Sequence, residues 1–232
     1  MDAATLQFLK AFDRIEAYLR TTLKTDGHVT YYSMIEQLSK SNAAVRRSSR
    51  ILKRLGDLRN LFSHQDREMA IPSPSAIAEV EQMANQLESP PLLMSLFSMN
   101  VETCSLGDPV GKAARLMHEH VFSQLPVMDS GRLVGLLTSE TIARWLATKL
   151  KDGMDLVAEE PVESVLRHQE SESKYKLVSR TATVFDGLKA FDDALHKGDS
   201  LEALLITNSG SATEALLGIS TPYDIPKMLK SI

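Results

Sequence analysis

Apolar residues in the N-terminal third of the chain recur every three to four positions, whereas those in the remainder occur in short runs. Between residues 6 and 23 the recurring positions are Leu6, Phe8, Leu9, Phe12, Ile15, Leu19 and Leu23. This spacing places apolar side chains on one face of a helix that packs against a core. The pattern therefore predicts a long amphipathic helix at the start of the chain.

Three more helices are predicted before residue 90. A second periodic run covers residues 31–38, and a third begins near Asn42, a favourable N-cap residue. The apolar positions of the third run are Val45, Ile51, Leu55, Leu58 and Phe62. A fourth helix starts within "PSPSAIAEVEQMANQL", where the prolines and Ser75 signal a helix start. Four amphipathic helices with short connections predict a small bundle over residues 1–89.

The pattern changes after "ESPPLL" at residues 88–93. Short apolar runs such as "LPVMD", "RLVGLLT", "ALLITN" and "ALLGIST" predict strands, and they alternate with the predicted helices "VGKAARLMHEH" and "FDGLKAFDDALHKG". Pro90 and Pro91 mark the boundary. We therefore expect an α+β protein, in which an all-α bundle at 1–89 precedes an α/β region at 90–232.

The α/β region repeats itself. The segment from Phe122 aligns with the segment from Leu201, which places Gly131 on Gly210. After a four-residue insertion in the second copy, Gly135 falls on Gly218. This self-similarity predicts two copies of one supersecondary unit.

The repeated unit ends in "GLLTSETI" at 135–142 and "GISTPYDI" at 218–225. A glycine turn, a strand and then Gly-apolar-x-Thr-x-x-Asp at the start of a helix resemble the CBS motif, and two such units resemble a tandem CBS pair. The resemblance implies a first motif at about 97–150 and a second at 160–232.

The hallmark segment has two interpretations. Thr221 is suited to an N-cap, Pro222 to the first helical position and Asp224 to the first turn, which requires no ligand. In the second interpretation, exposed amides at this helix start favour a phosphate group, while Asp224 accepts hydrogen bonds from ribose hydroxyls.

The CBS resemblance implies a cleft that holds an adenine nucleotide (AMP, ADP or ATP) as a regulatory ligand. Carried over to this chain, the nucleotide-binding residues are Asn100, Glu102, Phe122, Ser123, Ile219, Thr221 and Asp224. In the first copy, Thr138 and Thr141 stand at the hallmark positions, and a threonine cannot offer two carboxylate oxygens to a ribose. Occupancy of that first cleft stays open, and many CBS pairs serve mainly as dimerisation modules. We expect His118, His120, His168 and His196 to face solvent.

A basic stripe runs along the third predicted helix. Arg46, Arg50, Lys53 and Arg54 fall on one face at helical spacing, opposite the apolar positions. A solvated face is the ordinary explanation for such a stripe. Because the stripe leads to "LRNLFSHQD" at residues 58–66, RNA binding through these four side chains is the alternative.

The helical region with "LRNLFSH" resembles a HEPN domain, whose ribonuclease members carry an arginine, a polar residue and then a histidine. The matching catalytic candidates are Arg59, Asn60 and His64. Histidine can transfer protons near neutral pH, and arginine can stabilise a phosphate in the transition state. The resemblance implies metal-independent cleavage by the RNA 2′-hydroxyl. It also implies a homodimer, in which two copies of the motif meet.

A purely structural role is also open for these residues. Arg59 could pair with Asp57 or Glu36, and His64 could interact with carbonyl groups at the helix C-terminus. Many HEPN domains also bind partners without cleaving RNA. The bundle would then be a dimerisation or partner-binding module.

Composition limits the remaining classes of function. The net charge of −4 argues against general binding to polyanions, so that any nucleic-acid site must be local. Cys104 is the only cysteine and no Cys/His cluster has zinc-ligand spacing, so we expect no disulfide, no metal and a reducing compartment. The charged N-terminus does not resemble a signal peptide, and "PPLLMSLFSMNV" is too short to span a bilayer. These features predict a cytoplasmic regulator that senses an adenine nucleotide.

Overall fold

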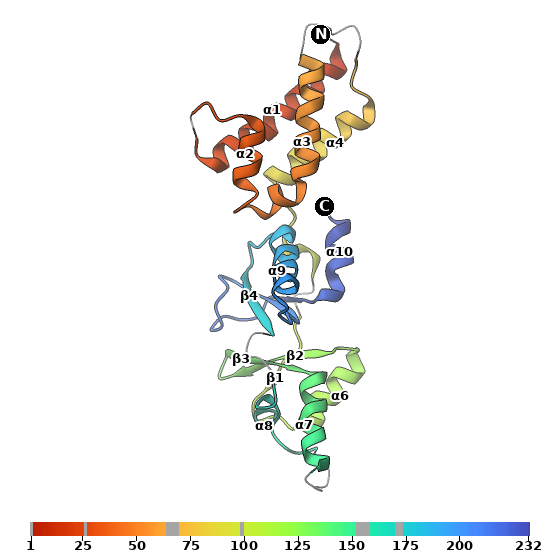
Figure 1. Ribbon diagram of the computed structural model, residues 1–232. Helices are drawn as coiled ribbons and strands as arrows, with labels where there is room; N and C mark the ends of the chain where they lie inside the picture. The colour runs from red at the N-terminus through yellow and green to blue at the C-terminus, as the bar shows by residue number, and fades with distance from the viewer. Residues whose placement is uncertain (1, 26, 64–69, 98–99, 152–157, 170–173) are drawn as a thin grey trace. The chain divides into compact units, whose positions relative to one another are not determined.

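The computed structural model describes residues 2–25, 27–63, 70–97, 100–151, 158–169 and 174–232. Contacts group the chain into two compact units. The first comprises Met1–Pro91, Thr183–Lys189 and Ser231–Ile232, and the second comprises Leu92–Ala182 and Ala190–Lys230. The predicted α+β class, with N-terminal helices followed by an α/β region, is confirmed (Figure 1).

The N-terminal part of the first unit is a helical bundle, coloured red to yellow in Figure 1. Its helices are α1 (Ala3–Leu23), α2 (Tyr31–Leu38), α3 (Ala43–Ser63) and α4 (Pro74–Glu88). The periodic positions of α1 form its core side, with Phe8, Phe12, Ile15 and Leu19 buried. Leu6 is 45% exposed, so the first apolar position of the pattern lies outside this core.

Polar side chains set the helix starts in the bundle. The Asn42 side chain accepts a hydrogen bond from the Val45 backbone at 3.0 Å, which confirms its role as an N-cap. Helix α4 begins at Pro74, and its N-cap is Ser73, which accepts from the Ala76 backbone at 3.2 Å. The sequence pattern took the prolines and Ser75 as the start signal. Pro74 is indeed the first helical residue, whereas the capping serine is Ser73.

Helices α2 and α3 approach closely at Gly56. A Cβ atom at this position would lie 2.8 Å from the Tyr31 ring. The Tyr31 hydroxyl donates a hydrogen bond to the Leu52 carbonyl at 3.0 Å, and burial raises the pKa of Tyr31. The missing side chain at Gly56 thus makes room for the tyrosine that joins the two helices.

Two small sheets of identical topology form the strands of the second unit. The first consists of β1 (Cys104–Ser105), β2 (Gln124–Asp129) and β3 (Arg132–Thr138), and the second of β4 (Tyr175–Ser179), β5 (Ala203–Thr207) and β6 (Gly218–Ser220). In each sheet the first pair of strands is parallel and the second pair antiparallel. The repeat seen in the sequence is therefore a repeat of strand order and direction.

Helices flank these strands in the chain. They are α5 (Leu93–Leu96), α6 (Val110–His120), α7 (Ser139–Lys151), α8 (Val162–Leu166), α9 (Val184–Lys197), the 3₁₀ turn η1 (Pro222–Asp224) and α10 (Ile225–Lys230). Leu137 of β3 packs with Met117 of α6, Trp145 of α7 and Val165 of α8. These helices cover the same face of the first sheet (Figure 1).

The opposite face of the first sheet packs against the second sheet. Leu136 of β3 belongs to a core cluster with Ala203 and Leu205 of β5, and the Leu133 backbone donates to the Ala212 carbonyl at 2.8 Å. Adjacent residues of a strand point to opposite faces of the sheet, so Leu136 and Leu137 of β3 pack into different core clusters. The two copies of the repeat are therefore packed sheet to sheet.

The aligned glycines share a left-handed backbone conformation. Gly131 has a φ of +79° and Gly210 a φ of +88°, a region that side chains with a Cβ rarely adopt. Ser130, directly before Gly131, also has a positive φ of +48°. Two successive residues with positive φ make the tight hairpin that joins β2 to β3.

Candidate ligand cleft

A cavity of about 900 Å³ lies between the two copies of the α/β repeat. Its walls include all seven residues that the sequence nominated for a ligand, namely Asn100, Glu102, Phe122, Ser123, Ile219, Thr221 and Asp224. These residues come from two segments, 100–123 and 219–224, that are more than ninety positions apart in the chain. We call this cavity the ligand cleft.

Asp224 is held in place by the residue that begins its turn. Its Oδ2 atom accepts hydrogen bonds from the Thr221 backbone at 2.8 Å and from the Thr221 hydroxyl at 3.2 Å. The Asp224 backbone donates to the Thr221 carbonyl at 3.0 Å. The capping interpretation and the ligand interpretation are therefore compatible, because the bonds that fix the carboxylate involve Oδ2 and none of them involves Oδ1.

The rim of the ligand cleft is apolar and exposed. Val121 is 91% exposed, Tyr223 87% and Phe122 42%. The Phe122 ring is stacked on His120, with centroids 5.3 Å apart and planes inclined by 16°. An aromatic ring fixed in this way can stack on a planar heterocycle.

Val121 has an unusual backbone conformation. It ends α6 with a φ of +57° and a ψ of +39°, in the left-handed region that β-branched residues rarely adopt. This conformation turns the chain from α6 into the segment that carries Phe122 and Ser123. Strain of this kind is often found at functional sites.

The carboxylates in the lining give the ligand cleft an acidic character. Glu102 and Asp224 supply two carboxylates to the lining. Among the described residues that line the cleft, none is a lysine or an arginine. The site therefore has a negative character at neutral pH.

Sequence reasoning missed several residues of the lining. They are Val101, Met117, His118, Val121, Gln124, Pro126 and Tyr223. His118 is exposed, as expected, but it also lines the cleft. Tyr223 lies within the hallmark segment itself, between the two nominated polar residues, and its position there was a signal that could have identified it.

Strand pairing defines the corresponding position in the other copy of the repeat. Cys104 pairs with Val127 in the first sheet, and Val178 pairs with Ile206 in the second. Because the repeat aligns Val127 with Ile206, Cys104 corresponds to Val178. This correspondence extends to the residues before both strands.

Lys174 corresponds to Asn100, because each lies four residues before a matched position, Val178 and Cys104 respectively. The Lys174 side chain is 4% exposed, and its ammonium group donates to Glu140 of α7 at 2.5 Å. A buried lysine of the second copy, paired with an acid that follows the first, therefore stands at the position that Asn100 has in the ligand cleft.

The hallmark residues of the first copy bond to each other. The hydroxyls of Thr138 and Thr141 lie 2.9 Å apart, and the Thr141 backbone donates to the Thr138 hydroxyl at 3.1 Å. Thr138 is 3% exposed and Thr141 1%. Both threonines therefore have their polar atoms satisfied within the protein.

The candidate catalytic residues of the helical region are described in part. Arg59 is partly exposed and Asn60 exposed near the end of α3, whereas His64 lies outside the described residues. The acids considered as partners of Arg59 have other partners. Asp57 accepts from the Tyr32 hydroxyl at 2.6 Å, which raises the pKa of that tyrosine, and Glu36 pairs with Lys53 at 3.3 Å.

The basic stripe makes contacts within the bundle. Arg46 donates to the carbonyls of Ser39 and Lys40 at 2.7 and 2.8 Å, just after α2. Arg54 forms an ion pair with Glu79 of α4, and Lys53 forms one with Glu36 of α2. Arg50 is exposed. The stripe thus joins neighbouring helices as well as presenting charge to solvent.

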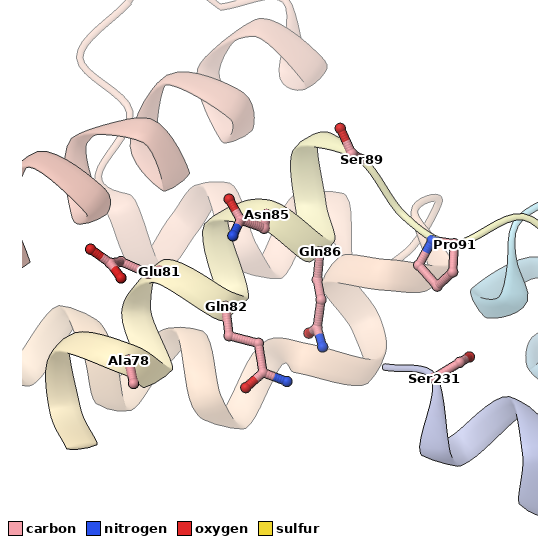
Figure 2. A pocket seen from close by; sticks show the side chains of 8 residues that line it. All are labelled: Ala78, Glu81, Gln82, Asn85, Gln86, Ser89, Pro91 and Ser231. Atoms are coloured by element: carbon pink, nitrogen blue, oxygen red, sulfur yellow. The ribbon is translucent and has the colours of Figure 1, made fainter. Parts of the chain in front are cut away.

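A second, shallower hollow of about 610 Å³ runs along α4 (Figure 2). Its lining includes Glu81, Gln82, Asn85 and Gln86. Two of these side chains hold α4 to α1, since Glu81 accepts from Gln7 at 2.7 Å and Asn85 from Arg14 at 2.8 Å. None of the residues nominated from the sequence lines this hollow.

Metal and thiol chemistry find little support in the described part of the chain. No group of three or more His, Cys, Asp or Glu residues there is arranged to hold a metal ion. Cys104 is 5% exposed, and burial raises the pKa of its thiol to about 11, which suppresses the reactive thiolate. None of the described helices is long and apolar enough to cross a membrane.

Two copies of one α/β motif, packed around a cavity, define a tandem-motif protein. The family model for the CBS domain matches residues 94–148. A search of curated proteins found no match to the chain.

The solved structures to which part of this chain is similar include CBS proteins. A signal-transduction protein with CBS domains from Burkholderia ambifaria shares 18% identity, with a TM-score of 0.43 over 57% of this chain and 84% of that chain. The CBS domain pair of protein MJ0100, in complex with 5′-methylthioadenosine and S-adenosyl-L-methionine, shares 18% identity, with a TM-score of 0.45 over 61% of this chain and 97% of that chain. CBSX2 in complex with AMP shares 17% identity, with a TM-score of 0.44 over 60% of this chain and 96% of that chain.

Proposed function

We propose that the protein is a regulatory sensor whose tandem CBS pair, at residues 90–232, binds an adenosine-containing ligand in the ligand cleft. One observation carries the proposal: seven residues nominated from the sequence, from both copies of the repeat, line a single cavity. The volume of about 900 Å³ suits a nucleoside or nucleotide, since small-molecule sites span roughly 300–1,000 Å³.

Asp224 is the residue that would recognise the ribose. Thr221 fixes its Oδ2 atom by two hydrogen bonds, and Oδ1 makes no hydrogen bond with another described residue. A carboxylate held in this way is preorganised to accept from ribose hydroxyls, and little conformational freedom is lost on binding. Phe122, stacked on His120, would support the adenine ring.

Calorimetric titration with adenosine, AMP, ADP and ATP tests this proposal. We expect Asp224→Asn to weaken binding of every adenosine-containing ligand by roughly tenfold or more, because hydrogen bonds to a charged acceptor are worth about 1.5–3 kcal/mol. Asp199→Asn is the control, since Asp199 is an exposed acid of the same unit outside the cleft. Absence of binding to the wild type would leave a dimerisation module as the remaining function of the pair.

A metal-independent ribonuclease activity in a HEPN-like domain at residues 1–89 is a second proposal. The sequence Arg59-Asn60 followed by His64 after three residues supports it, together with the position of Arg59 and Asn60 near the end of α3. In a homodimer two such half-sites would supply both the proton acceptor and the proton donor. The basic stripe adds little support, because Arg46, Lys53 and Arg54 have partners in the bundle.

RNA degradation by the wild type, Arg59→Ala and His64→Ala tests the ribonuclease proposal. We expect both variants to lose cleavage while retaining the ligand affinity of the α/β unit. Equal activity in all three proteins would exclude these residues from catalysis. Thermal stabilisation by AMP without any cleavage would instead favour a non-catalytic energy sensor.

Regulation requires that the ligand prefer one of two arrangements of the protein. The rate of RNA cleavage should then change when the ligand cleft is filled. This rate is measured with and without AMP, in the wild type and in Asp224→Asn. An effect of AMP that survives in the variant would contradict control through this cleft.

A further inference from the structure

The ligand cleft has the wrong charge for a polyphosphate. Its two carboxylates, Glu102 and Asp224, face the same cavity, and among the described lining residues no lysine or arginine offsets them. Glu102 makes no ion pair with another described residue. A ligand with several negative charges would be repelled at close range, where screening by salt is weak.

The nearest lysine along the chain from Asp224 is engaged elsewhere. Lys227 donates to the Leu96 carbonyl and lies over the Phe97 ring, 5.0 Å from its centroid. Its ammonium group is therefore held outside the cleft lining. Lys227 is therefore not available to bind a phosphate group in the cleft.

The turn at the cleft also offers few amide donors. The Thr221 amide donates to Asp224, Pro222 has no N–H group, and the Asp224 amide donates to the Thr221 carbonyl. One interpretation of the hallmark segment predicted free backbone amides at this helix start. The amides of Thr221 and Asp224 instead donate to acceptors within the turn. The α-helix that follows, α10, has only six residues and so contributes a small dipole.

From these observations we infer that the cleft selects adenosine derivatives whose 5′ group is neutral or cationic, and discriminates against nucleoside di- and triphosphates. This inference rests on the proposed function, since it names the ligand class of the same site. Glu102 is the specificity-determining residue. Its carboxylate attracts a positive 5′ group and repels a phosphate, while Asp224 is occupied with the ribose.

A matched pair of ligands isolates the charge. S-adenosyl-L-methionine and S-adenosyl-L-homocysteine differ by one methyl group and one positive charge on sulfur. In titrations without divalent cations we expect the sulfonium to bind the wild type roughly tenfold more tightly, and ATP to bind at least roughly tenfold more weakly than adenosine. Raising the salt concentration should weaken sulfonium binding and strengthen ATP binding.

Glu102→Gln removes one charge at nearly constant shape. We expect it to reduce the sulfonium preference to about threefold or less, and to strengthen AMP binding several-fold. Glu119→Gln is the control, because Glu119 is an exposed acid of α6 outside the cleft lining and its loss should leave both ratios unchanged. Retention of the wild-type preference in Glu102→Gln would overturn the role of Glu102.

The two possible failures are distinguishable. ATP or AMP binding more tightly than adenosine to the wild type would overturn the charge selectivity and leave the proposed sensor intact. Binding of none of these adenosine compounds would overturn both proposals.

Discussion

Lys174 and Glu140 form an ion pair in which the lysine is 4% exposed and the carboxylate 46% exposed. The Lys174 carbonyl also accepts hydrogen bonds from the backbone of Glu202 and Ala203, at 2.7 and 3.3 Å. The lysine is therefore fixed at both its backbone and its ammonium group. Lys174 corresponds to Asn100 of the ligand cleft, so the equivalent position in the other copy holds a side chain that is already paired within the protein.

This relationship predicts that one chain binds one ligand. Thr138 and Thr141 are buried and bonded to each other, and Lys174, at the position that corresponds to Asn100, is paired with Glu140. We expect calorimetric titration of the wild type to give one ligand per chain. Asp224→Asn should then weaken this single binding event by roughly tenfold or more. A second binding event that keeps its affinity in this variant would show that the other copy also binds ligand.

The partners of the ion pair should differ in their effects on stability. Glu140→Gln leaves the buried ammonium group of Lys174 without its carboxylate, whereas Lys174→Met removes the buried charge and leaves Glu140 bonded to Arg144. We expect the first change to destabilise the fold by about 2–3 kcal/mol and the second by less than about 1 kcal/mol. Urea unfolding measures both. Equal losses would mean that the pair contributes through attraction alone.

The same pair gives a defined dependence on pH. Hydrogen bonds from Lys174 and then Arg144 lower the pKa of Glu140 from its ordinary 4.5 to about 2. Because the folded value is the lower one, this contribution to stability is complete above about pH 4.5 and is lost as the pH falls toward 2. We expect the free energy of unfolding to decline more steeply across this window in the wild type than in Glu140→Gln. Parallel declines would place the acid sensitivity in other carboxylates.

The sequence predicted the lining of the ligand cleft better than the features of the corresponding region in the other copy. The nominated residues were carried over from the CBS resemblance, and all seven line one cavity. The match of Lys174 with Asn100 could not be read from the sequence, because it depends on the pairing register of β4 and β5. Hydrophobic alternation defines the face of a strand but leaves its neighbours undefined.

Charge patterns were less informative than apolar patterns. The spacing of the basic stripe correctly placed its residues on α3, but it could not show that Arg46 reaches the carbonyls after α2 or that Arg54 meets Glu79. Long flexible side chains find partners that helical periodicity does not encode. Apolar spacing likewise could not show that Leu6 lies outside the core, since burial at the end of a helix depends on what packs there.

Gly56 provides a test of packing in the bundle. A Cβ atom would lie 2.8 Å from the Tyr31 ring, which is itself held by its hydrogen bond to Leu52. We expect Gly56→Ala to destabilise the protein by about 1–3 kcal/mol in thermal or urea unfolding, because the overpacked ring must move. Gly107→Ala is the control, since nothing lies within 4 Å of the Cβ position there. Similar stability of the two variants would mean that Tyr31 moves aside at little cost.

Val121 links strain at the rim to binding. A β-branched residue with a φ of +57° is strained, and it is 91% exposed, so that few contacts compensate in the absence of ligand. We expect Val121→Gly to stabilise the unliganded protein by up to about 1 kcal/mol, because glycine adopts this region freely. The same change should weaken ligand binding a few-fold, since it removes apolar rim surface and loosens the segment that carries Phe122.

Thermal unfolding with and without adenosine measures both effects. Lys24→Gly, at the left-handed end of α1, is the control that should gain stability without a change in affinity. Lower stability of Val121→Gly would instead show that the valine side chain contributes more through contacts than its backbone loses through strain.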